Sequence, residues 1–185
     1  KGVPEDLRSA VPYRLPELLD AIAKGQTVYV VEGEKDADRL AALGRVATCN
    51  ACGAGKWKES HSKWLKGADA VVIPDNDDLG HNAARIEAEG LLGIAKAVRM
   101  IDLRDGWKEI PDKGDFSDMA DALGDAEALR ILDAIAGKTD IMEQDDRQRV
   151  AALYARVPGY CVEDGCICAW NGETIKRLCT FMVWP

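Results

Sequence analysis

The stretch Thr27-Val28-Tyr29-Val30-Val31-Glu32-Gly33-Glu34-Lys35-Asp36-Ala37 decides the fold of this chain. Its first five residues form a short, continuously apolar run rich in β-branched side chains, which is typical of a strand buried on both faces of a sheet. The next segment, 34–43, has the spacing of an amphipathic helix, and Gly44 ends it. The pattern therefore predicts a strand that turns directly into a helix, with Glu32 and Gly33 in the turn.

The same strand-to-helix alternation continues along the chain. Further short apolar runs predict strands, and periodic segments between them predict helices. Alternation at these lengths indicates an α/β fold with about four parallel strands and flanking helices. The predicted strands are 27–31, 46–49, 70–74 and 97–103; the predicted helices are 34–43, 61–66, 80–92, 116–123 and 126–136.

Three regions are expected. Residues 1–25 form a connector that ends in a short helix, and residues 26–137 form the α/β domain. Residues 138–185 begin a further element, a small α+β appendage with a helix near 140–155 followed by a β-meander over 159–184. No internal repeat or low-complexity segment is present.

Composition narrows the classes of function. The 185 residues are 47% hydrophobic and 30% charged, which is typical of a chain with a packed core, and no apolar run is long enough to span a membrane. The absence of a signal-peptide pattern favours a cytoplasmic location. The formal net charge of −8 argues against a broad DNA-coating surface. The six cysteines have spacings that favour reduced thiols over a zinc site, including Cys49 and Cys52.

Acidic residues follow three of the predicted strands. Glu32 follows the first, Asp75 and Asp77 follow the strand at 70–74, and Asp115 lies in the segment after the last strand. Ligands of open parallel sheets bind outside the carboxyl ends of the strands, and carboxylate oxygens suit Mg²⁺. For any single acid, capping of a helix is the simpler explanation, and Asp36, Asp78 and Asp115 are candidates for that role. Successive clusters at one sheet edge favour a cation site.

A glycine-rich segment at 53–58 contains Lys56, Trp57 and Lys58. Exposed backbone amides and Lys56 would suit a phosphate, and tryptophans interleaved with lysines suit single-stranded nucleic acid. Equally, the tryptophans would pack in the core and the lysines would be solvated. His61 and His81 are expected at the surface.

These motifs together resemble the topoisomerase–primase (Toprim) domain, most closely that of primases and primase–helicases of phages, plasmids and integrated elements. The likeness rests on four ordered segments over about residues 11–136: 32–37, 53–57, 74–77 and 113–115. It implies a Rossmann-like Toprim fold. It also implies that Glu32 acts as general acid or base or binds metal, and that Asp75, Asp77 and Asp115 bind Mg²⁺ or Mn²⁺. Lys35, Lys56, Trp57 and Lys58 would contact nucleotide or nucleic acid.

The resemblance implies a nucleotidyltransferase that joins nucleoside triphosphates into an RNA primer on a single-stranded DNA template. A helicase or other domain of the same larger protein is an expected partner, and the fragment alone is expected to be weak or inactive. Two alternatives remain open: a Toprim-type metal-dependent nuclease, and a non-catalytic module of a larger replication protein.

Overall fold

The structure is a computed structural model that describes residues 11–50 and 57–143, together with the backbone of strands at 160–163, 166–170 and 175–180. The chain divides into two compact units, residues 1–142 and 143–185. The first unit contains the parallel sheet that the alternation predicts, so the expected α/β class is confirmed.

Four parallel strands form the sheet, in the order β2-β1-β3-β4. Val28 of β1 pairs with Val46 of β2 on one side and with Ala70 of β3 on the other, and Ala70 pairs with Val98 of β4. The strands are β1 Thr27–Val30, β2 Val46–Thr48, β3 Asp69–Val72 and β4 Ala97–Met100. Each is shorter than its predicted run, although β1, β3 and β4 each gain at least one more ladder hydrogen bond beyond their last residue.

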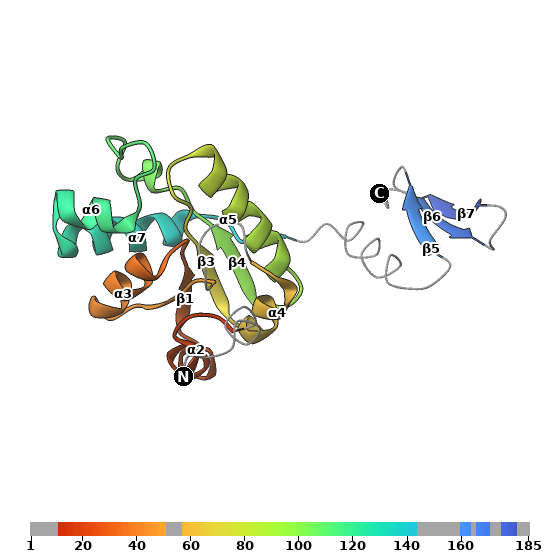
Figure 1. The fold of residues 1–185 in the computed structure, drawn as a ribbon, viewed down its shortest axis with the longest axis horizontal. Helices are drawn as coiled ribbons and strands as arrows, with labels where there is room; N and C mark the ends of the chain where they lie inside the picture. The colour runs from red at the N-terminus through yellow and green to blue at the C-terminus, as the bar shows by residue number, and fades with distance from the viewer. Residues whose placement is uncertain (1–10, 51–56, 144–159, 164–165, 171–174, 181–185) are drawn as a thin grey trace, which may run out of the picture. The chain divides into compact units, whose positions relative to one another are not determined.

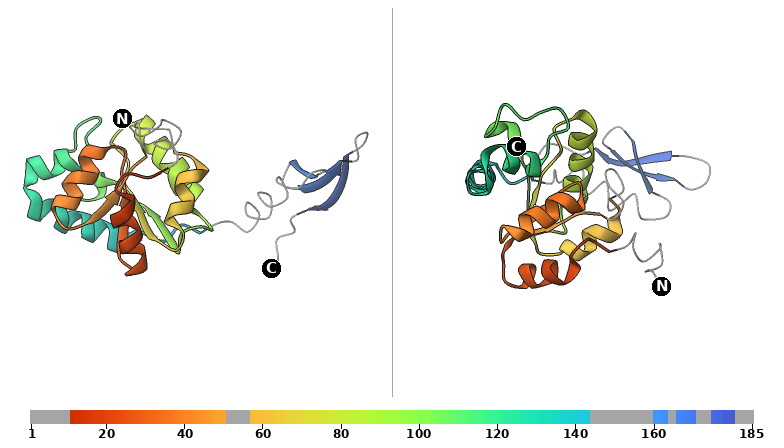
Figure 2. Two further views of the ribbon diagram at one scale, coloured as in Figure 1. Left: turned by 60° about the horizontal axis from the view of Figure 1, so that its bottom comes forward. Right: turned by 60° about the vertical axis from the view of Figure 1, so that its left-hand side comes forward.

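Helices cover both faces of this sheet. Helices α3, α6 and α7 pack on one face around Leu40, Phe116 and Leu132, which are fully or almost fully buried. Helices α2, α4 and α5 pack on the other face around Leu18 and Leu91, and Figures 1 and 2 show α5 on the opposite side of the sheet from α3, α6 and α7. The helices are α2 Leu15–Ala23, α3 Glu34–Ala42, α4 Glu59–Ser62, α5 Asp78–Leu91, α6 Phe116–Leu123 and α7 Asp125–Lys138, with short 3₁₀ turns η1 Lys63–Leu65 and η2 Leu103–Asp105.

Local chemistry explains where the helices begin and end. Asp77 accepts a hydrogen bond from the backbone N–H of Gly80 and so caps α5. Asp115 and Asp118 form a reciprocal capping box at the start of α6. Gly44, with a φ of 79°, lies in the left-handed conformation just after α3 and donates its N–H to the Ala41 carbonyl.

The second unit contains a three-stranded antiparallel sheet, β5 Tyr160–Glu163, β6 Cys166–Trp170 and β7 Ile175–Thr180. This arrangement confirms the predicted meander. The helix expected near 140–155 falls largely on residues outside the described part of the chain. Across the described residues no helix has the length and apolarity that a membrane crossing requires.

Candidate active site at the strand ends

The strand order places the predicted acids at a particular point of the sheet. The chain passes from β1 to β2 on one side, then returns to β3 on the other side of β1. The carboxyl ends of β1 and β3 are therefore the topological switch point, where open α/β sheets bind their ligands. The Ile73 N–H still bonds the Val30 carbonyl, so Glu32 and Asp75 leave the sheet as neighbours.

Glu32 and Asp75 form the centre of the site. Burial, first of all, and then the charges of Glu32, Asp36 and Asp115 and a side-chain hydrogen bond with Glu32 together raise the pKa of Asp75 to about 7. Two carboxylates in contact cannot both be charged cheaply. Near neutral pH the pair therefore retains a proton or requires a cation.

Asp36 is a third acid of this site, and the helix-cap interpretation of it is wrong. It is buried within α3, one turn after Glu32, and its Oδ1 accepts hydrogen bonds from the Ser117 N–H, at 2.9 Å, and from the Ser117 hydroxyl. Burial raises the pKa of Asp36 to about 6, and the bonds from Ser117 oppose that rise. Asp36 therefore ties α3 to the start of α6.

Asp115 lies at the same edge but is already engaged. Its Oδ1 accepts the Asp118 N–H at 2.8 Å, and its Oδ2 lies 2.5 Å from the Lys35 ammonium. The hydrogen bond that the Lys35 ammonium donates to Asp115 is the main cause of a raised Lys35 pKa. The capping interpretation of Asp115 is thus correct, and Lys35 is brought to the acid cluster as a resident cation.

Asn76 fixes the turn that carries Asp75 and Asp77. Its N–H donates to the Gly114 carbonyl at 2.9 Å, and its carbonyl accepts the Lys113 N–H at 3.0 Å. Its side-chain amide also donates to the Pro111 carbonyl at 2.7 Å. Gly80 allows the turn to fold tightly, since a Cβ at that position would lie 2.7 Å from the Asp75 carbonyl oxygen. The motif is therefore braced against the segment that leads to Asp115.

The donors present suit a hard divalent cation. In the described part of the chain, no group of three or more His, Cys, Asp or Glu side chains is arranged to hold a metal on its own. Mg²⁺, however, usually takes only one or two carboxylates and completes its shell with water and phosphate. The Glu32–Asp75 pair supplies two carboxylates whose repulsion a cation would relieve, so the residues fit such an ion.

Glu87 is an acid that the sequence interpretation missed. It lies on α5 with 4% of its surface exposed, and burial together with the charge of Glu32 raises its pKa to about 8. The buried positions of α5 include Ala83, Ala84, Ala88 and Leu91. Position 87 falls within that stripe, so its helical spacing was a signal that an acid lies in the core.

The glycine-rich segment is seen only at its end, because Lys56 lies outside the described residues. Trp57 is half-buried against the core beside α5, and its indole N–H donates to the Ser62 hydroxyl at 2.8 Å. Lys58 is exposed. The expectation that His61 is at the surface is wrong: it is 1% exposed, stacks beside Trp57 with ring centroids 5.3 Å apart, and accepts the Lys58 N–H at 2.9 Å.

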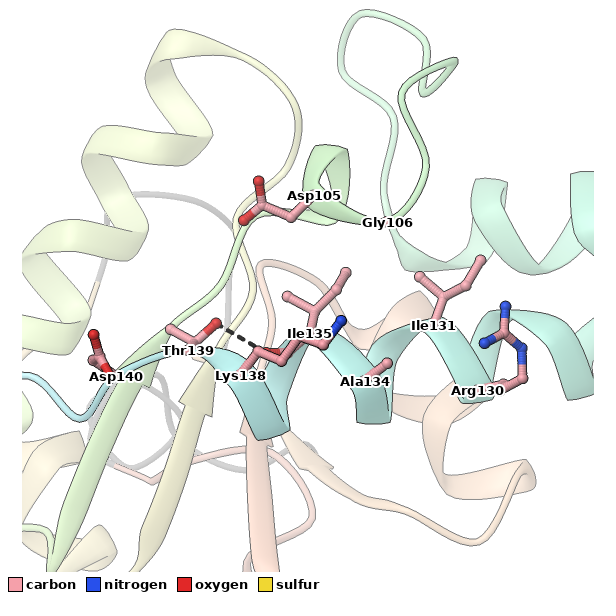
Figure 3. Close-up of a pocket in the computed structure, with 9 residues that line it drawn as sticks. All are labelled: Asp105, Gly106, Arg130, Ile131, Ala134, Ile135, Lys138, Thr139 and Asp140. Atoms are coloured by element: carbon pink, nitrogen blue, oxygen red, sulfur yellow. Dashed lines mark hydrogen bonds between the residues drawn. The ribbon is translucent and has the colours of Figure 1, made fainter.

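A cavity of about 500 Å³ lies elsewhere, between η2 and α7 (Figure 3). Its floor is Ile131 and Ile135, and none of the predicted site residues lines it. Gly106 also lines the cavity, and it packs closely on the floor, since a Cβ at this position would lie 2.4 Å from the Ile131 side chain. Arg130, which also lines it, pairs with Glu127 at 2.6 Å. This cavity is therefore separate from the acid cluster.

Comparison with solved structures supports the fold. The chain is similar to the DnaG primase catalytic domain bound to ssDNA and to the E. coli primase catalytic core, each with a TM-score of 0.53 and 18% identity over 80% of this chain and 50% of that chain. It is also similar to a further DnaG catalytic core, with a TM-score of 0.52 and 21% identity over 82% of this chain and 53% of that chain. No protein-family model and no curated protein matches the chain. The chain thus has a primase-like fold and spans about half the length of these structures.

Proposed function

We propose that this chain carries the metal-dependent nucleotidyl-transfer site of a primase-like protein, which joins nucleoside triphosphates into RNA primers on single-stranded DNA. The observation that carries the proposal is the Glu32–Asp75 contact at the switch point of a fold shared with primase catalytic cores. The motif resemblance to primases of phages, plasmids and integrated elements supports the same assignment.

Each residue has a role in this proposal. Asp75 and Glu32 would hold Mg²⁺ or Mn²⁺, with Asp77 adjoining them, and the bound ion would neutralise triphosphate charge and favour ionisation of the attacking hydroxyl. Glu32 would accept the proton of that hydroxyl. Lys35, held at the cluster by Asp115, would contact phosphate oxygens. Asp36 is a positioning residue, since Ser117 holds its carboxylate.

The partners follow from the same proposal. One similar structure is a primase catalytic domain bound to single-stranded DNA. We infer a single-stranded template and nucleoside triphosphates for this chain, a helicase or other domain of the same protein as its partner, and a cytoplasmic location. Because the chain spans about half of the similar catalytic cores, full activity would require the remainder of the protein.

Cation binding tests the proposal without requiring full activity. Mn²⁺ affinity would be measured by electron paramagnetic resonance for wild type, Asp75→Asn and Glu32→Gln. Asp20→Asn is the matched control, because Asp20 is an exposed acid of α2 that pairs with Lys24. We expect both site variants to weaken Mn²⁺ binding at least about tenfold, since each removes a carboxylate ligand. Unchanged affinity in Asp75→Asn would overturn the proposal.

Primer synthesis is the second measurement, made on the full-length protein with single-stranded DNA, ribonucleotides and Mg²⁺ or Mn²⁺. Loss of product in Asp75→Asn with retention in Asp20→Asn supports nucleotidyl transfer. Cation-dependent nicking of DNA without nucleotides would instead identify a nuclease. Absence of cation binding in the wild type would identify a non-catalytic module.

A further inference from the structure

A polar cavity of about 630 Å³ opens beside the Asp75–Asp77 turn, next to the acid pair. It is lined by Asn76 and Asp77, which precede α5, by Asp78, Leu79 and His81 of the first turn of α5, and by Arg104 and Asp112 from the segment after β4. Its volume lies within the range of small-molecule pockets. Of the acids assigned to the proposed site, Asp77 is the one that lines this cavity.

Arg104 is held in place before any ligand arrives. Its Nε lies 3.0 Å and 2.9 Å from the two carboxylate oxygens of Asp102, and its Nη2 lies 2.5 Å from Oδ2. The same Nη2 lies 3.2 Å from Nε2 of His81. A guanidinium thus fixed loses little side-chain freedom when it binds a ligand.

Donors remain available on this wall of the cavity. Among the described residues, none bonds the Nη1 group of Arg104, so its two hydrogens are free to bond a ligand. Because a guanidinium only donates, Nε2 of His81 accepts, which places the ring proton on Nδ1 as a further donor. The cavity lining therefore offers the fixed Arg104 guanidinium beside the Nδ1–H of His81, and this combination suits phosphate oxygens.

The same lining also carries Asp77, Asp78 and Asp112. These three carboxylates would repel a free anion, and Arg104 would repel a bare cation. A metal-bound polyphosphate carries both signs, and it would place its cation toward Asp77 and its phosphates toward Arg104. The mixed lining therefore selects this class of ligand over either ion alone.

We infer that Arg104, fixed by Asp102 and His81, binds the phosphate oxygens of a metal-bound polyphosphate, namely an incoming nucleoside triphosphate or its pyrophosphate product. The inference rests on the proposed function and extends it to residues outside the motif segments. It makes Arg104 a substrate-binding residue and Asp102 its positioning residue.

The test is isothermal titration of pyrophosphate, and separately of a nucleoside triphosphate, into protein holding Mn²⁺. Arg104→Gln is compared with Arg85→Gln, because Arg85 is an exposed arginine of α5 that pairs with Glu89 and its replacement removes the same charge. We expect Arg104→Gln to weaken both ligands about tenfold or more, because it removes a charge-assisted contact. Arg85→Gln should leave both affinities within about twofold of wild type.

Asp102→Asn provides a second variant, in which Arg104 is present but its guanidinium is no longer held by the Asp102 carboxylate. We expect it to lose less pyrophosphate affinity than Arg104→Gln. Equal pyrophosphate affinity in wild type and Arg104→Gln would overturn the inference. It would also be overturned if Arg104→Gln weakened the binding of a single-stranded DNA oligonucleotide, titrated in the same way, and left pyrophosphate affinity unchanged. Mn²⁺ binding measured without phosphate distinguishes failure of the Arg104 inference from failure of the proposed function. Normal Mn²⁺ affinity with no effect of Arg104→Gln refutes only this inference, whereas Mn²⁺ affinity unaffected by Asp75→Asn refutes the proposed function.

Discussion

Replacing Glu87 with glutamine should make the protein more stable at neutral and alkaline pH. Glu87 is buried in α5 beside Glu32, and its pKa rises from an ordinary value of 4.5 to about 8. An acid whose pKa is higher in the folded than in the unfolded state does not lower the free energy of unfolding at low pH, where it is protonated in both states. The penalty grows as pH rises above about 4.5, where the unfolded chain ionises, and levels off above about 8, where the folded chain ionises too.

The size of this penalty follows from the interval between the two pKa values. One pKa unit corresponds to about 1.4 kcal/mol, so the ceiling is about 5 kcal/mol above pH 8 and about 3 kcal/mol at pH 7. Side-chain movement and water entry lower such ceilings, and we expect about 2 kcal/mol at pH 7. Glutamine has nearly the same shape and does not ionise, so Glu87→Gln should lose that part of the pH dependence.

The measurement is urea unfolding of wild type and Glu87→Gln across this pH range, with a chelator present to exclude divalent cations. Glu89→Gln is the matched control, because Glu89 lies on the exposed side of the same helix. The pH dependence that Asp36 and Asp75 contribute is common to all three proteins and cancels in the difference. Parallel stability curves for wild type and Glu87→Gln would refute the argument that a strained carboxyl lies at position 87.

Three further predictions concern the bonds around the acid pair. Ser117→Ala should cost about 1–3 kcal/mol in urea unfolding at neutral pH, because the buried Asp36 carboxylate loses its hydroxyl donor, and Ser117→Thr should restore part of the loss. Asn76→Ala should cost about 1 kcal/mol and increase amide hydrogen exchange near Asp75, whereas Asn82→Ala on the exposed face of α5 should change neither. Mn²⁺ should raise the melting temperature and release protons near pH 7, and an unbuffered titration showing no proton release would contradict the raised pKa of Asp75.

Sequence patterns were sufficient for the elements of the α/β unit because each strand lies in or overlaps a short apolar run and each major helix has a buried stripe. The order β2-β1-β3-β4 is not contained in those patterns, since periodicity says which face is buried and nothing about which strand pairs with which. The convergence of Glu32 and Asp75 therefore depended on the motif resemblance and on the general rule for strand ends. His61 was misplaced because four-residue α4 is too short to show a periodic face, and its burial depends on contact with Trp57.

The capping and metal-binding interpretations of the aspartates are compatible because a carboxylate has two oxygens. Asp77 accepts the Gly80 N–H on Oδ1, and the cap uses only that oxygen, so it orients the residue and leaves the second oxygen for a ligand. Asp115 differs, since Oδ1 bonds the Asp118 N–H and Oδ2 contacts the Lys35 ammonium. A divalent ion could reach Asp115 only by displacing Lys35. Asp115 therefore acts through Lys35 for as long as that ion pair holds, and the proposed cation site would depend on Glu32 and Asp75.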